Sequence, residues 1–335
     1  MDILLTSVGR RTYMVEYFKE ALNHTGLVHA ANSVETYAMK VADRSVVTPL
    51  IYNSSYIGFL LDYCLTNKVE AIIPLFDIDL PILSRNKDEF AANGITIVVA
   101  DPDFIKICND KWFTFNFFKS NRFRVPETYL SLSSALEAVS DNIIQYPLII
   151  KPRWGMGSIG IFQADNREEL KMFYRKTLNS INGSYLKYES QKAPEDSVII
   201  QEKLCGGEYG IDIFNDLDGR LLTCVPKKKL AMRAGETDSA EILENRKLFE
   251  IGKTISSLAK HIGNLDIDCF FIENEFYVLE MNCRFGGQYP FSHMAGVNFP
   301  KALIHMLLGK KVESGFLKPS KGVIGIKDIV PRRFK

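Results

Sequence analysis

The sequence predicts a fold of two parts, in which a doubly wound α/β domain precedes a larger α+β region. Three observations support this prediction. Short apolar runs alternate with amphipathic stretches over the first hundred residues, the pattern changes near residue 109, and strand–turn–strand patterns dominate after residue 198. Alternation of strands and helices is typical of a parallel sheet covered by helices, whereas hairpins are typical of antiparallel sheets.

The elements of the first part follow from the spacing of its apolar residues. In chain order we expect a strand at 2–6, a helix at 11–22, a strand at 27–31, a helix around 54–66, a strand at 71–75, a helix near 80–91 and a strand at 95–100. Together these elements predict a Rossmann-like domain.

The first turn of this domain lacks the glycine pattern of a dinucleotide site. Only Gly9 is present where G-x-G-x-x-G is required, so binding of NAD loses its main support. Arg10 and Arg11 could hold an anion at the start of the following helix, but a solvated helix terminus is the favoured interpretation. Asp77 and Asp79 lie either at the ligand-facing edge of the sheet or act as helix caps.

The second part mixes helices with hairpins. We expect helices at 109–120 and 133–140, strands at 146–151 and 159–164, a polar loop at 179–197, strands at 197–204, 208–214 and 221–230, a long helix at about 241–261, a hairpin of strands 266–272 and 275–282, and a helical end. No internal repeat is present.

Composition excludes several classes of protein. The 335 residues carry 41 basic and 40 acidic side chains, a net charge of +1, which provides no overall field for a polyanion. No apolar stretch approaches the roughly 18 residues that span a bilayer, and no signal peptide is evident. The six cysteines are scattered without a CxxC pair, which indicates free thiols. We therefore expect a cytoplasmic protein that binds neither nucleic acid nor membrane.

A glycine-rich turn follows a strand at residues 147–164. Lys151 ends the strand, and Gly155, Gly157 and Ser158 form the turn. A lysine at a strand end holds one ammonium group in a fixed place, and glycine turns let backbone N–H groups surround phosphate oxygens. This is not a Walker loop, and a plain hairpin is the alternative interpretation.

Polar residues with the spacing of a metal site lie on the late hairpin. Asp268 and Glu280 are twelve residues apart, and Asn282 and Arg284 follow Glu280 with a two-residue period that places them on one face. Two carboxylates and an amide suit Mg²⁺, and an arginine beside them suits a carboxylate or a phosphoryl group. Each residue alone could be an exposed polar side chain, but that interpretation explains the set poorly.

Two further segments carry weaker signals. At 198–214, two strands joined by a short linker resemble a hinge, although an ordinary connection with a bulge at Gly206–Gly207 is the alternative. At 225–239, alternation along the strand points Lys227 and Lys229 to one side, and Arg233 and Glu236 enter a glycine-containing loop.

Together, the glycine-rich motif YPLIIKPRWGMGSIGI and the pattern of Asp268, Glu280, Asn282 and Arg284 resemble the ATP-grasp superfamily of carboxylate–amine ligases. The similarity is to the branch of biotin carboxylase and the carbamoyl-phosphate synthetase large subunit. It implies a preceding Rossmann-like domain over 1–108 and a two-lobed ATP-grasp fold with a small lobe over 109–197 and a large lobe over 198–335.

The resemblance implies a role for each matching residue. Lys111, Lys151, Gly155, Gly157 and Ser158 would hold the phosphates of ATP; Glu202, Lys203, Leu204 and Glu208 would contact adenine and ribose; Ile149, Phe270 and Leu279 would enclose the adenine ring; Asp268, Glu280 and Asn282 would bind two Mg²⁺ ions, with Mn²⁺ as a substitute; and Arg284, Arg233 and Lys229 would be catalytic.

The implied reaction activates a small carboxylate, such as an amino acid, as an acyl phosphate and joins it to an amine. The partners would be these small molecules, and the resemblance allows a homodimer. Carboxylation or carbamoylation with bicarbonate, and a catalytically idle ATP-binding regulatory protein, are the alternatives.

Overall fold

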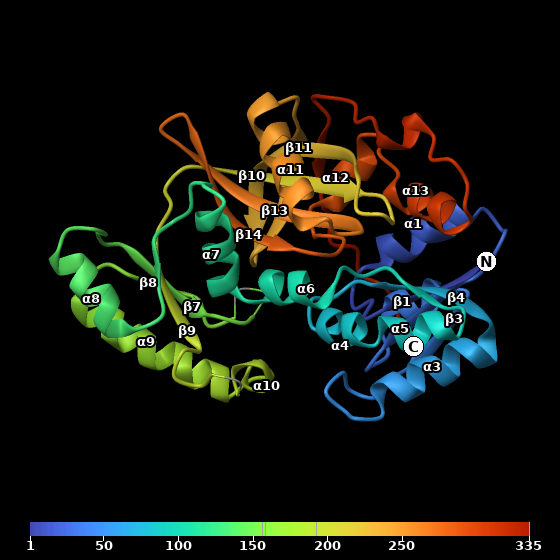
Figure 1. Cartoon of the computed structure of the whole chain (residues 1–335), viewed down its shortest axis with the longest axis horizontal. Coiled ribbons are helices and arrows are strands. Elements are labelled where there is room, and N and C mark those ends of the chain that lie inside the picture. The colour runs from blue at the N-terminus through green and yellow to red at the C-terminus, as the bar shows by residue number, and fades with distance from the viewer. Residues whose placement is uncertain (156, 158, 192, 335) are drawn as a thin grey trace.

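The computed structural model describes residues 1–155, 157, 159–191 and 193–334. Its strands form a five-stranded, a four-stranded and a six-stranded sheet. The three sheets belong to three regions that surround a common centre (Figure 1). The fold is mixed α/β and α+β, as the sequence predicts.

The N-terminal sheet is parallel, with strand order β3-β2-β1-β4-β5. Its strands are β1 (Asp2–Thr6), β2 (Val28–Asn32), β3 (Arg44–Val47), β4 (Val69–Pro74) and β5 (Thr96–Ile97). Its helices are α1 (Thr12–Leu22) and α2 (Tyr37–Val41) on one face, and α3 (Tyr56–Asn67), α4 (Asp79–Arg85) and α5 (Lys87–Ala92) on the other. Helices on both faces make the domain doubly wound.

Four details of this domain differ from the sequence prediction. The expected helix at 80–91 is divided into α4 and α5 by Asn86, and the expected strand at 95–100 pairs only at β5. Two short elements, α2 and β3, were not predicted, because each has at most five residues and periodicity needs more.

The four-stranded sheet is antiparallel, with order β6-β9-β7-β8. Its elements are β6 (Thr128–Tyr129), α8 (Leu132–Ser140), β7 (Leu148–Pro152), β8 (Phe162–Ala164), α9 (Arg167–Asn182), α10 (Lys187–Ser190) and β9 (Val198–Glu202). The prediction of a loop over 179–197 was wrong at 179–182 and 187–190, which are helical. Helix α9 is polar overall and buries few side chains, so its apolar residues do not show a clear helical period in the sequence.

The six-stranded sheet is antiparallel, with order β14-β13-β10-β11-β12-β15. Its strands are β10 (Gly207–Asn215), β11 (Leu221–Arg233), β12 (Glu236–Ile242), β13 (Gly263–Ile272), β14 (Glu275–Asn282) and β15 (Ile324–Ile326). The helix expected at 241–261 is α11 (Arg246–Ala259), because its first residues belong to β12. The helical end comprises α12 (Tyr289–Met294), α13 (Phe299–Leu307) and the short 3₁₀ helix η1 (Ser314–Leu317).

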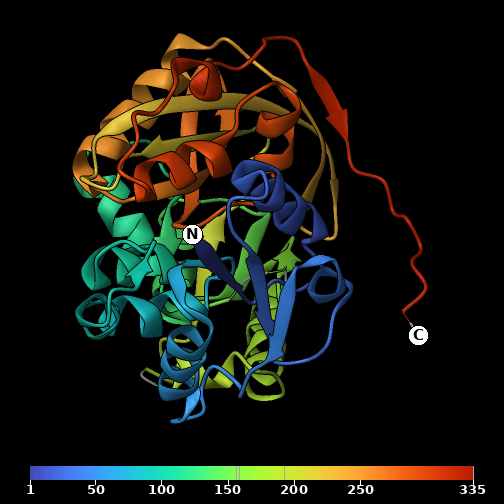
Figure 2. The same cartoon turned by 90° about the vertical axis from the view of Figure 1, so that its right-hand side faces the viewer.

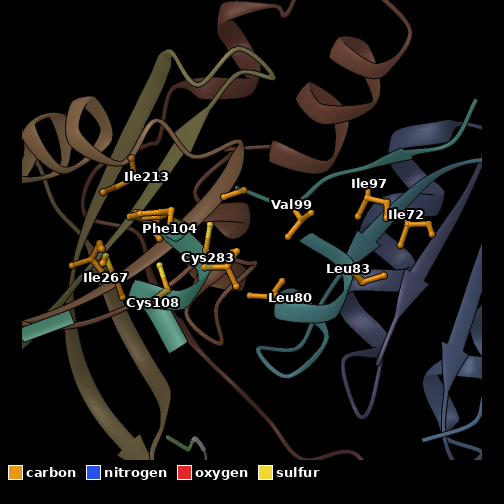
Figure 3. Packing of buried hydrophobic residues seen from close by; sticks show 14 of the residues in the cluster. Ile72, Leu80, Leu83, Ile97, Val99, Phe104, Cys108, Ile213, Ile267 and Cys283 are labelled. Carbon is orange, nitrogen blue, oxygen red and sulfur yellow. The ribbon is translucent and has the colours of Figure 1, made fainter. Parts of the chain in front are cut away.

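One hydrophobic core joins the N-terminal sheet to the six-stranded sheet. Helices α6 (Pro102–Asn109) and α7 (Lys111–Ser120) connect the two regions. The core runs from Ile72 and Leu83 through Phe104 to Ile267 and Cys283 (Figure 3). Residues on both sides of position 108 contribute to this core. The division of the chain into 1–108, 109–197 and 198–335 therefore remains a proposal.

The chain leaves the six-stranded sheet after β15 and runs along the side of the molecule (Figure 2). There Lys40 donates a hydrogen bond to the carbonyl of Phe334. All six cysteines are free thiols, as expected, and only Cys205 is exposed. Among the described residues, no helix is both long and apolar enough to cross a membrane.

Candidate active site

A polar cavity lies where the three regions meet. Its lining comes from the carboxyl end of the N-terminal sheet, the start of α7, the glycine-rich turn and one face of the six-stranded sheet. The lining residues are Arg11, Phe76, Asp77, Lys111, Gly155, Gly157, Lys229, Gly235, Glu236, Thr237, Asp266, Asp268, Glu280, Asn282, Arg284, Gly287 and Gln288. Most of the predicted metal-binding and catalytic residues therefore share one cavity.

A β-bulge at Leu279 aims the acidic residues into the cavity. Asp268 pairs with Glu280 across β13 and β14, but the next residue, Cys269, pairs with Val278, so Leu279 is the extra residue. Before the bulge Val278 faces the core, and after it Met281 does. The bulge thus turns Glu280, and Asn282 after it, to the side of Asp268. Their shared face agrees with the prediction, whereas the bulge was not predicted.

Two lysines face these acids from the four-stranded sheet side. Lys151 Nζ donates to Gln201 Oε1 at 2.8 Å and, with Lys111 and Glu280, lines an adjoining pocket. Burial lowers the pKa of Lys151 to about 8, with Lys111 adding to the shift and Glu280 opposing it. Burial alone would raise the pKa of Glu280, but the surrounding cations, led by Lys111 and Lys151, lower it. The acid is therefore held as a carboxylate.

Lys111 owes its position to the start of α7. Asp110 caps this helix by accepting from the backbone N–H groups of Trp112 and Phe113. The buried Arg153 also donates to Asp110, at 2.8 Å, and so fixes the root of the glycine-rich turn to the helix. Lys111 Nζ donates to the carbonyl of Gly155 at 2.5 Å.

The glycine-rich turn needs glycine for its backbone shape. Gly155 and Gly157 have φ values of +152° and +65°, a region that residues with a side chain rarely adopt. The predicted contribution of Ser158 lies outside the described residues.

Arg284 forms an ion-pair network at the other end of the cavity. Its Nη2 lies 2.8 Å from Asp77 Oδ2, and its Nη1 lies 3.3 Å from Asp266 Oδ2. Burial alone would lower the pKa of Arg284, but these two carboxylates raise it. Burial, followed by the charge of Asp268, raises the pKa of Asp266 to about 7. Asp77 therefore lies at the ligand-facing edge, one of the two predicted alternatives.

Two lysines of β11 each pair with a carboxylate on another strand of the same sheet. Lys229 Nζ lies 2.6 Å from Asp268 Oδ1 at the cavity, and Asp268 raises the pKa of Lys229 although burial alone would lower it. Lys227 pairs with Asp212 in the interior. Arg233, in contrast, does not line the cavity, and its exposed guanidinium bonds to Asp238. The structure thus does not bring this predicted catalytic residue to the others.

The residues predicted to contact the nucleoside lie around the hinge and the paired strands. Phe270 and Leu279 are half-buried on β13 and β14, and Ile149 is half-buried on β7. The backbone N–H of Glu202 donates to the carbonyl of Glu127 at 2.9 Å. Lys203 Nζ donates to Gln163, while Leu204 and Glu208 are half-buried.

Arg11 is a site residue that the sequence analysis missed. The favoured solvated position is wrong, because its Nη1 donates to the carbonyls of Leu75, at 2.5 Å, and Phe285, at 2.9 Å. Arg10 is the exposed member of the pair. The signal that could have located Arg11 is its place just after the first strand, at the edge where parallel α/β sheets bind ligands.

The cavity offers a hard oxygen donor set. Among the described residues no three His, Cys, Asp or Glu side chains cluster as a metal site. Asp268, Glu280 and Asn282 nevertheless supply two carboxylates and an amide on one face. This set fits Mg²⁺, which takes its remaining ligands from phosphate oxygens and water.

Two families match the sequence of the chain. Residues 3–98 match the family described as the PylC-like N-terminal domain, and residues 194–326 match that described as ATP-grasp in the biosynthetic pathway with Ter operon.

Among curated proteins, a carbamoyl-phosphate synthase of Methanobrevibacter smithii is 22% identical over 267 residues, which are 73% of this chain and 66% of the relative. A D-alanine–D-alanine ligase of Petrotoga mobilis is 25% identical over 203 residues, 56% of this chain and 61% of the relative. The chain thus matches less than two thirds of the length of these relatives.

Solved structures share the fold. The biotin carboxylase domain dimer of Hydrogenobacter thermophilus 2-oxoglutarate carboxylase, in complex with MgADP, ADP and bicarbonate, has a TM-score of 0.72 at 18% identity, covering 92% of this chain and 70% of that one. An L-amino acid ligase from Bacillus licheniformis has a TM-score of 0.69 at 17% identity, covering 95% and 77%. With the sequence matches to both parts of the chain, these similarities show that the chain shares the fold of ATP-grasp enzymes.

Proposed function

We propose that this chain is an ATP-dependent ligase that activates a small carboxylate as an acyl phosphate and joins it to an amine. One observation carries the proposal. Lys111 lines one cavity with Asp268, Glu280 and Arg284, and Lys151 faces Glu280 in the adjoining pocket. Cations opposite carboxylates are the arrangement that a polyphosphate with bound Mg²⁺ requires.

In this proposal the nucleotide occupies the side of the cavity next to the four-stranded sheet. Lys111, Lys151, Gly155, Gly157 and Ser158 hold the phosphates. Asp268, Glu280 and Asn282 would hold Mg²⁺, as two ions and with Mn²⁺ as a substitute. When bound, the metal neutralises charge on the phosphates. Phe270, Leu279 and Ile149 enclose adenine, and Glu202, Lys203, Leu204 and Glu208 contact its edge and the ribose.

The proposed reaction has two steps. A carboxylate oxygen attacks the γ-phosphorus, the bond from that phosphorus to the β-bridging oxygen breaks, and ADP leaves. The amine nitrogen then attacks the acyl carbon, and phosphate leaves with the former carboxylate oxygen. Lys229 and Arg284 hold the anionic carboxylate and steady the acyl phosphate, so catalysis relies on positioning and electrostatics. A role for Arg233 would require the β11–β12 hairpin to move inward.

The small lobe contributes to the exclusion of water. Tyr188 of α10 stacks on Tyr52 of the N-terminal domain, with ring centroids 4.5 Å apart. This contact holds the lobe next to a pocket that Asp77, Trp154 and Leu186 line. Exclusion of water protects an acyl phosphate from hydrolysis.

Carboxylation or carbamoylation with bicarbonate is the second candidate function. The bicarbonate bound in the structure of the 2-oxoglutarate carboxylase domain supports it. That same structure is described as a dimer, which supports a homodimer as the assembly of this chain.

A phosphate-release screen tests the proposal. The full-length chain is mixed with Mg-ATP and amino acids, singly and in pairs, or with bicarbonate and ammonia. We expect release of ADP and phosphate that depends on the acid, and its loss in Glu280→Gln. Glu275→Gln, an exposed change on the same strand, is the matched control and keeps the activity. Normal turnover by Glu280→Gln would overturn the proposed site.

A further inference from the structure

Two charged side chains at the N-terminal end of the cavity have binding capacity that the protein itself does not use. Arg11 follows β1 and Asp77 follows β4, and these strands are neighbours in the parallel sheet. Because the carboxyl ends of neighbouring parallel strands meet at the same edge of the sheet, both side chains reach the cavity.

Arg11 is a cation with no carboxylate partner. Its Nη1 bonds only to the carbonyls of Leu75 and Phe285, and among the described residues no carboxylate lies within ion-pair distance of its guanidinium. Arg284 and Lys229 of the same cavity each pair with a carboxylate. A guanidinium presents its donors as a planar fork, so Nε and Nη2 of Arg11 remain to hold an anion.

Asp77 has an acceptor with no donor. Its Oδ2 accepts from Nε and Nη2 of Arg284, at 3.1 and 2.8 Å. Its Oδ1 is buried and has no hydrogen-bond partner among the described residues. A buried acceptor without a donor is costly, so a ligand that donates to Oδ1 would be favoured.

We propose that Arg11 and Asp77 bind the amine substrate as a zwitterion, with its carboxylate on Arg11 and its amino group on Asp77 Oδ1. The amine substrate is therefore an amino acid. This inference rests on the proposed ligase function and specifies the class of its second substrate.

The placement suits the second step of the reaction. Asp77 contacts Arg284, which steadies the acyl phosphate, so an amino group on Asp77 lies beside the acyl carbon. The ammonium gives one proton to Asp77, and its nitrogen forms the new C–N bond as the C–O bond to phosphate breaks. The second proton leaves with hydrogen phosphate, and Asp77 returns its proton to solvent.

The inference separates the two candidate functions. Ammonia has no carboxylate, so in a reaction of bicarbonate with ammonia Arg11 would bind no group of the amine substrate. An amino acid uses both Arg11 and Asp77 Oδ1.

Amine substrates that differ only at the carboxylate test this inference. Phosphate release and amide product are measured for the full-length chain with Mg-ATP, the carboxylate found in the screen, and each amino acid beside its carboxamide, such as alanine and alaninamide. We expect the amino acid to be favoured in kcat/KM by about 10- to 100-fold, the range for loss of a charged hydrogen bond. Equal use of the two, or turnover with ammonia alone, would overturn the inference while the ligase proposal stands.

Variants of the arginine pair complete the test. Arg11→Met should raise KM for the amino acid and abolish the preference over the carboxamide, with KM for ATP unchanged. Arg11→Lys should restore part of the preference. Arg10→Met, at the exposed neighbour, should keep it in full. Retention of the preference in Arg11→Met overturns the inference, and if that variant does not fold, the wild-type comparison decides. Absence of any acid-dependent ADP formation would instead contradict the proposed function.

Discussion

Two lysines on β11 have the same chemistry and different surroundings. Lys227 and Lys229 are two residues apart, face the same side of the six-stranded sheet, and each pairs with an aspartate of that sheet, on β10 and β13 respectively. The Lys227–Asp212 pair is fully buried, with side-chain exposures of 0% and 0%, whereas the Lys229–Asp268 pair has exposures of 4% and 22% and lines the cavity.

Helix α12 creates this difference. It lies over the first pair, where Ser292 Oγ donates to Asp212 Oδ2 at 2.6 Å. The helix does not extend over the second pair, which leaves Asp268 accessible to a ligand. A sealed ion pair constrains the fold, and an accessible one can act on substrate. The depth at which a pair lies therefore distinguishes a structural ion pair from one that can act in catalysis, although the two lysines are only two residues apart.

The largest expected effect concerns the stability of the sealed pair. Lys227→Met leaves Asp212 as a buried charge without its partner, and we expect a loss of about 3–5 kcal/mol in the free energy of unfolding. Chemical denaturation measures this loss. The double variant Lys227→Met/Asp212→Leu should recover much of the stability, since it removes both charges. A loss below about 1 kcal/mol in the single variant, typical of a surface pair, would contradict the assignment.

Loss of the accessible pair should lower activity more than stability. Lys229→Met removes a cation that holds the anionic substrate, and we expect kcat/KM to fall by about 10²- to 10³-fold. Denaturation of the same variant should show a smaller stability loss than Lys227→Met, because solvent reaches Asp268. Equal stability losses in the two variants would remove the distinction between the pairs.

Gly210 marks the border between the pairs. On β10, Gly210 pairs with Asp268 of β13 on one side and with Lys227 of β11 on the other. A Cβ at this position would lie 1.7 Å from Gln288 Oε1. Gln288 in turn donates to Asp266. Gly210→Ala should cost about 1–3 kcal/mol by overpacking and also lower activity. Gly58→Ala is the matched control, because no atom lies within 4 Å of its added Cβ.

A pH dependence of stability is expected from the buried His261. Burial lowers the pKa of His261 to about 4 from its ordinary value of 6.5. As pH falls from 6.5 toward 4, the unfolded chain binds a proton that the folded chain does not, so stability falls by up to about 1.4 kcal/mol per pH unit. His261→Gln should reduce this slope. Unfolding curves of both proteins between pH 4 and 7 give the comparison, and equal slopes would contradict the prediction.

The sequence predicts the residues of the site better than their arrangement. The spacing of Asp268, Glu280, Asn282 and Arg284 survives in the structure because a hairpin is local, and local pairing is encoded by nearby residues. The bulge at Leu279 was missed because a one-residue insertion leaves no mark in a two-residue pattern.

Long-range packing accounts for the other misses. Arg11 is held by the carbonyl of Phe285, 274 residues away, so no local pattern distinguishes it from the exposed Arg10. In the same way, only the fold shows that α12 covers Lys227 and not Lys229. Contacts between distant segments decide which charges are sealed and which are available for chemistry.

An acyl phosphate formed in the cavity would pass one carboxylate oxygen to the released phosphate. The full-length chain is incubated with Mg-ATP, the amine, and the carboxylate substrate labelled with ¹⁸O in its carboxyl group. We expect the released phosphate to contain one ¹⁸O atom, carried over when the acyl C–O bond breaks. Phosphate released during turnover without ¹⁸O would contradict an acyl phosphate and with it the proposed function.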